Sequence, residues 1–116
     1  MKGFLVMYFI LKQCYELCGE ESLGIFLGEI SPELWGNGMP IDRALLDDWI
    51  SFFENRSMQK DCFTAAIRIF LGQYEGEGGF DFSHTKRLLR DIPQSMYDHA
   101  VLEMKRMYSS FQYDFE

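Results

Sequence analysis

Apolar residues recur with helical spacing along most of the chain, and this periodicity restricts the possible folds more than any other feature of the sequence. It is clearest in residues 96–111, where the apolar side chains fall in one arc of about 140° on a helical wheel. That arc contains Met96, Tyr97, Ala100, Val101, Met104, Met107, Tyr108 and Phe111. We therefore predict a peripheral helix with one buried face, for which Ser95 is the candidate N-cap residue.

Two segments in the middle of the chain show the same periodicity to different degrees. Residues 43–56 have a polar side opposite an apolar side, and Asp42 is the candidate N-cap. The apolar side consists of Leu45, Leu46, Trp49, Ile50, Phe52 and Phe53, and the polar side of Asp47, Asp48, Ser51, Glu54 and Asn55. In residues 58–74 the apolar positions cover roughly two thirds of the wheel. This second segment is predicted to be the central and most buried helix.

Of the other helical segments, the first leaves an alternative open and the rest are short. Residues 5–18 favour a helix by their length, although the apolar run 4–11 alone could equally form a buried strand. Residues 22–29 and 84–91 each predict a short helix, and the residues from Ser31 indicate a helix of one turn. The segments together predict five or six helices.

Length and composition favour one helical domain. The chain has 116 residues, of which 47% are hydrophobic, enough for the core of a single domain. We predict an all-α fold, a compact single-domain bundle of five or six helices over residues 1–116 around the central helix at 58–74. The run 4–11 is shorter than the roughly 20 residues of a membrane-spanning helix, and no signal-peptide pattern accompanies it. Met7 is a second candidate start, besides Met1.

The cysteines offer one candidate metal site. Cys14, Cys18 and Cys62 are an odd number and do not form a disulfide framework, so we expect a reducing, cytoplasmic location. With His84 they could complete a tetrahedral zinc site. Cys14 and Cys18 lie on an apolar helix side, however, where a free cysteine is ordinarily a core residue. We therefore predict no metal and no cofactor.

Candidate catalytic residues are few. His84 and His99 are the only histidines, and Asp81 lies three residues before His84. That spacing near the start of a predicted helix favours a cap over an acid–base pair, so we predict no catalytic residues. The alternative is a small helical enzyme or ligand-binding bundle that uses His84 and Asp81, and a cavity lined by His84 and polar groups would favour it. Lys86, Arg87 and Arg90 form a small basic face, as suits a helix C-terminus.

Charge is unevenly distributed along the chain. The formal net charge is −7, and residues 1–55 hold nine acidic and three basic residues, whereas the remainder is nearly neutral. This acidity argues against nucleic acids and anionic membranes as partners. An acidic surface instead attracts a basic protein over long distances. The competing explanation is that acidity keeps an aromatic-rich protein soluble.

The candidate partner-binding residues are Asp47, Asp48, Glu54, Glu33 and Trp35. Trp35 lies in a turn-rich segment, where it either covers the core or anchors a partner, and the first role is favoured. In charge and size the chain resembles bacterial toxin-neutralising (immunity) proteins and antitoxin-like inhibitors, a resemblance that carries no residue assignments. We expect a non-enzymatic interaction protein whose conjectured partner is a basic protein such as a toxin or nuclease.

Overall fold

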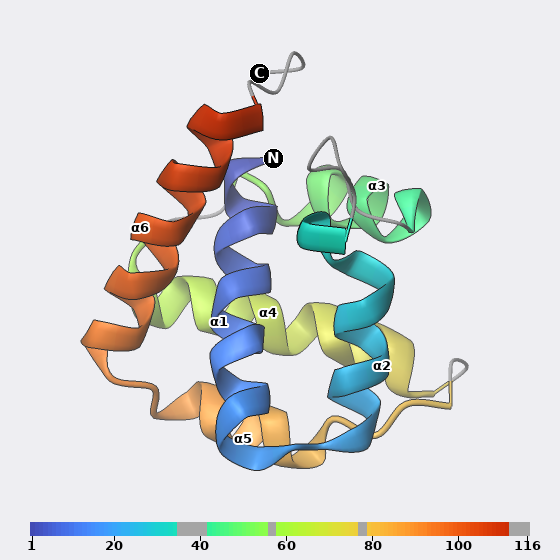
Figure 1. Ribbon diagram of the computed structural model, residues 1–116. Helices are drawn as coiled ribbons and strands as arrows, with labels where there is room; N and C mark the ends of the chain where they lie inside the picture. The colour runs from blue at the N-terminus through green and yellow to red at the C-terminus, as the bar shows by residue number, and fades with distance from the viewer. Residues whose placement is uncertain (35–41, 56–57, 77–78, 112–116) are drawn as a thin grey trace.

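The computed structural model describes residues 1–34, 42–55, 58–76 and 79–111, and every regular element in these ranges is helical (Figure 1). The all-α prediction is therefore confirmed. In chain order the elements are α1 (Lys2–Cys18), α2 (Glu21–Ile30), the 3₁₀ helix η1 (Pro32–Leu34), α3 (Arg43–Phe52), α4 (Lys60–Glu75), α5 (Ser83–Arg90) and α6 (Gln94–Phe111).

Helix α1 forms the centre of the bundle. Its buried residues are Gly3 to Leu11 without interruption, together with Cys14. It contacts α2, α3, α5 and α6, and Figure 1 shows α6 on one side of it and α2 on the other. Because residues 4–11 are apolar on every side, they suit a helix surrounded by other helices. The strand alternative for this run is thus excluded, and a chain starting at Met7 would lack buried residues of α1.

The prediction that residues 58–74 form the most buried helix was wrong. Helix α4 begins at Lys60 and buries one face, made of Phe63, Thr64, Ala66, Ile67, Phe70 and Leu71. On its outer face Cys62 is exposed and Ile69 is 57% exposed. A wheel counts every apolar residue as a core residue, whereas folded proteins leave many single apolar side chains in water. The wide apolar arc of α4 therefore led to the prediction of more burial than the helix has.

Aromatic side chains join α2, α3 and α4. Phe26 of α2 and Trp49 of α3 both meet Phe70 of α4, with ring centroids 6.2 and 5.2 Å apart. Trp49 also stacks on Phe53 at 5.3 Å. Such edge-to-face and offset pairs stabilise the core beyond the burial of their area.

Helix α6 has the predicted buried face. Tyr97, Ala100 and Met104 are buried, and Met96, Val101, Met107 and Tyr108 pack against the core at partial exposure. The helix begins at Gln94, so Ser95 lies inside its first turn and is not the N-cap. Among the described residues, no helix combines the length and apolar character needed to cross a lipid bilayer.

The two sides of α4 give a paired stability test. Replacing Phe70, which is fully buried, by alanine should cost about 3–5 kcal/mol because it leaves a cavity. Ile69→Ala should change the free energy of unfolding by less than about 0.5 kcal/mol, since the side chain is already in water. Urea unfolding followed by circular dichroism measures both. Similar losses for the two variants would contradict the one-sided burial of α4.

Candidate functional site

Two of the predicted partner-binding residues lie on the outward face of α3. Asp47 and Asp48 are both exposed. Asp47 pairs with Arg43 one turn earlier at 3.2 Å, an exposed pair that contributes little to stability. Asp48 accepts a hydrogen bond of 2.7 Å from the hydroxyl of Tyr74, at the end of α4. The carboxylate of Asp48 is thereby held in place while it remains at the surface.

Apolar side chains stand beside these acids. Ile50 and Phe52 were predicted to belong to the buried side of this helix, and that prediction was wrong: they are 36% and 63% exposed. Helix α3 buries only Leu45, Leu46 and Trp49, because a peripheral helix of ten residues needs only a narrow apolar stripe. The face around Asp47 and Asp48 is therefore both acidic and apolar.

Two further acids, Glu29 and Asp42, lie at the start of α3. The backbone amide of Asp42 donates to the carbonyl of Glu29 at 2.8 Å, which places the end of α2 next to the start of α3. Burial, and then the charge of Asp42, raise the pKa of Glu29. Burial, followed by the hydrogen bond to Asp48, also raises the pKa of Tyr74. Burial is the main cause of both shifts, and the neighbouring carboxylates add to it.

Glu33 and Trp35, two more of the predicted residues, have different outcomes. Glu33 accepts hydrogen bonds of 2.7 Å from the Tyr8 hydroxyl and from Lys12 Nζ. Burial alone would raise the pKa of Glu33, but these hydrogen bonds and the charge of Lys12 outweigh it and lower the pKa. Glu33 is therefore already paired within the chain. Trp35 lies outside the described residues.

Glu54 is not a surface acid, and its assignment to the polar side of the helix was wrong. Its carboxylate accepts the backbone amides of Gly3 at 2.8 Å and Phe4 at 3.1 Å, and Trp49 Nε1 at 2.8 Å. It also pairs with the amino group of Met1 at 2.8 Å, and its side chain is only 16% exposed. Since α3 ends at Phe52, Glu54 lies in the following turn, where positions on a helical wheel no longer apply.

His84 and Asp81 do not form an acid–base pair. Hydrogen bonds from the hydroxyl and the backbone amide of Ser83 hold the pKa of Asp81 below its usual range, which makes this exposed carboxylate a weak base. A cavity of about 370 Å³ does lie beside His84. Its lining consists of Leu17, His84, Arg87, Leu88, Asp91, Ile92, Pro93 and Met96, without Asp81.

The cysteines are spread over different environments. Cys14 is buried, Cys18 is half-buried and Cys62 is exposed. The thiol of Cys62 donates a hydrogen bond of 3.1 Å to Gln59 Oε1. Burial, and then the neighbouring Cys18, raise the pKa of Cys14 to about 12. Within the described ranges no group of three metal-ligating side chains lies close together.

A basic pocket between α4 and α5 is the feature that sequence reasoning missed. Its volume is about 300 Å³, and Ala65, Arg68, Ile69, Lys86 and Arg90 line it. Lys86 and Arg90 belong to the basic face predicted for α5, but Arg68 comes from α4. The basic face of α5 and the charge of Arg68 among the apolar residues around it were the signals in the sequence, but nothing in the sequence indicated that they meet.

Comparisons with protein-family models, with curated proteins and with solved structures find no match for this chain. The function is therefore argued from the geometry of these surfaces.

The Glu54 carboxylate should contribute strongly to stability. Glu54→Ala removes the acceptor of two backbone amides and of the Trp49 ring nitrogen, together with the carboxylate that pairs with the Met1 amino group, and should cost at least about 2 kcal/mol. Urea unfolding measures the loss. Asp47→Asn removes the same charge from an exposed site and should cost less than about 0.5 kcal/mol. Equal effects of the two changes would refute the capping role of Glu54.

Thiol labelling should separate the cysteines. With an aromatic disulfide reagent at pH 8, exposed Cys62 should react first, and Cys14 should react only after unfolding, because burial disfavours its thiolate. In Cys62→Ser the fast phase should disappear. Rapid labelling of Cys14 in the folded protein, identified by peptide mass, would contradict the burial of this cysteine.

Proposed function

We propose that this protein is a non-enzymatic binding protein that captures a basic protein partner on the outward face of α3. The observation that carries the proposal is the exposure of Ile50 and Phe52 beside Asp47 and Asp48. Protein interfaces combine an apolar, often aromatic centre with charged residues around it. The face of α3 contains both kinds of side chain, with Ile50 on the Asp47 side and Phe52 on the Asp48 side of the acids. Glu54, which accepts amides of α1, is not part of this face.

The electrostatics at this edge support a cationic partner. The pKa of Glu29 is raised mainly by burial and further by the charge of Asp42, so these two carboxylates repel each other. A Lys or Arg side chain arriving from a partner would reduce that repulsion. Charged groups of this kind accelerate association, while an apolar contact at Phe52 would slow dissociation.

The class of partner follows from the charge and size of the chain. With a net charge of −7 the protein repels nucleic acids and attracts basic proteins. A basic toxin or nuclease that the protein neutralises in the cytoplasm is the partner we propose.

A second candidate function rests on the cavity beside His84. Its volume of about 370 Å³ is that of a small-ligand pocket, and apolar residues line it together with His84, Arg87 and Asp91. It favours binding of a small, partly apolar ligand. Leu88→Arg would obstruct this cavity and leave α3 unchanged, so a function that depends on the cavity responds to this variant alone.

The test compares two variants of equal net charge. Asp47→Asn with Asp48→Asn removes two acids from α3, whereas Glu16→Gln with Glu21→Gln removes two exposed acids from α1 and α2. Both are immobilised beside the parent protein, and proteins captured from a lysate of the source cell are identified by mass. We expect a basic protein whose association rate at low salt falls about tenfold with the α3 variant.

The salt dependence and the apolar contact complete this test. The α3 variant should also lose most of the salt dependence of association, while the Glu16 and Glu21 variant stays close to the parent. Phe52→Ser should mainly increase the dissociation rate. Equal association rates for both charge variants would show that only the total charge matters, and the α3 face would then have no role in binding.

A further inference from the structure

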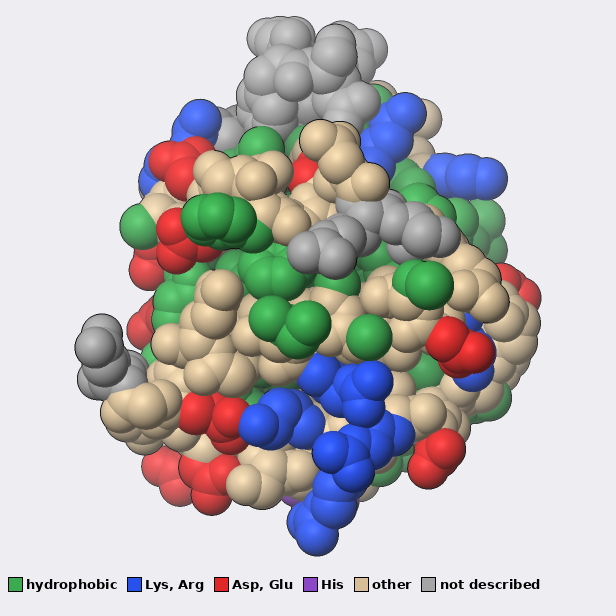
Figure 2. All heavy atoms as spheres, turned by 180° about the vertical axis from the view of Figure 1, so that it is seen from behind, with side chains coloured by type: hydrophobic (Ala, Val, Ile, Leu, Met, Phe, Trp, Pro, Cys, Tyr) green, Lys and Arg blue, Asp and Glu red, His purple; other side chains and the backbone are tan. Residues whose placement is uncertain are grey.

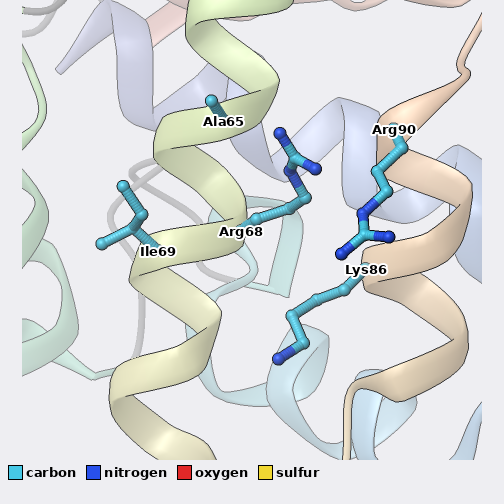
Figure 3. Close-up of a pocket in the computed structure, with 5 residues that line it drawn as sticks. All are labelled: Ala65, Arg68, Ile69, Lys86 and Arg90. Atoms are coloured by element: carbon cyan, nitrogen blue, oxygen red, sulfur yellow. The ribbon is translucent and has the colours of Figure 1, made fainter.

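Three cationic side chains from two helices converge on one pocket. Figure 3 shows Arg68 of α4 extending toward α5, and Lys86 and Arg90 of α5 reaching back toward α4. Figure 2 shows that Lys and Arg side chains form a continuous patch on this side of the molecule. The pocket thus has a charge opposite to that of the whole chain.

The two guanidinium groups have no counter-charge in contact with them. Lys86 pairs with Glu75, whose other carboxylate oxygen accepts the backbone amide of Phe82 at 3.0 Å. Arg68 and Arg90 make no ion pair or hydrogen bond with any residue that the structure describes. Glu75 therefore offsets one of the three positive charges and fixes the start of α5, and two charges remain.

Local helix preferences do not account for this arrangement. Arg90 lies in the last turn of α5, where the helix dipole favours a cation, but Arg68 lies in the middle of α4. The Nε atom of Arg68 is buried without a hydrogen-bond partner among the described residues. A buried donor without an acceptor is costly, and an anion bound to the remaining N–H donors of this guanidinium would help to offset that cost.

We propose that this pocket binds the phosphoryl group of a small soluble phosphate compound. Guanidinium groups donate paired hydrogen bonds to phosphate oxygens, and a lysine ammonium adds a point charge. The two uncompensated charges match a phosphate dianion. The volume of about 300 Å³ suits a small ligand, and exposed Ile69 and Ala65 provide an apolar wall for the remainder of it. This site is separate from the α3 face and does not depend on it.

Calorimetric titration of the full chain with inorganic phosphate and with pyrophosphate tests the proposal. Saturable binding at one site per chain is expected, with pyrophosphate the tighter ligand because it places more charge near the arginines. Arg68→Gln and Arg90→Gln should each weaken binding at least about tenfold. Arg106→Gln is the matched control, since Arg106 is exposed on α6 and pairs with Glu103 at 3.0 Å, and it should leave binding unchanged.

Circular dichroism establishes that each variant is folded before titration. Arg90 is exposed, so Arg90→Gln keeps the test valid even where Arg68→Gln perturbs α4. Absence of saturable binding by the parent protein would overturn the proposal, and so would equal losses in the Arg90 and Arg106 variants. The Asp47 and Asp48 double variant should bind pyrophosphate at least as well as the parent, which separates this proposal from the one for α3.

Discussion

The carboxylate of Glu54 holds the start of the most buried helix in the protein. The first amides of an α-helix have no partner within the helix, and away from water they need an acceptor from elsewhere. Glu54 supplies it to Gly3 and Phe4, and Trp49 donates to the same carboxylate from the core of α3. A Cβ atom on Gly3 would lie only 3.1 Å from the Glu54 carboxylate, so glycine permits this approach.

A second glutamate, Glu20, also accepts the first amides of a helix. This helix is α5, whose start lies near the C-terminal end of α1. Glu20 follows Gly19, the C-cap of α1, and accepts the amides of His84 at 2.9 Å and Thr85 at 3.1 Å, at the start of α5. The positive end of each helix dipole favours such a carboxylate. Part of the acidity of the first half of the chain is therefore structural, whereas Asp47 and Asp48 of α3 are among the acids that remain exposed.

Although the net charge of the chain is negative, its surface has an acidic face and a separate basic pocket. Asp47 and Asp48 project from α3 beside exposed apolar side chains, whereas Arg68 and Arg90 meet between α4 and α5. The acidic face is suited to a protein, because it carries an exposed aromatic residue beside its acids. The basic pocket is small and concave, as for a small anion. The two proposed activities can therefore be altered independently.

The sequence by itself determined the helices and most of their buried faces, because apolar periodicity depends only on local spacing along the chain. It located α6 and its buried arc, and it identified Asp42 as the N-cap of α3, whose side chain accepts the amide of Leu45 at 3.1 Å. Only the tertiary structure showed that α1 lies at the centre and that Glu54 accepts the first amides of α1. It also showed that Arg68 lines a pocket together with residues of α5. These outcomes depend on residues far apart in the chain coming together, and a wheel drawn for one segment contains no information about its neighbours.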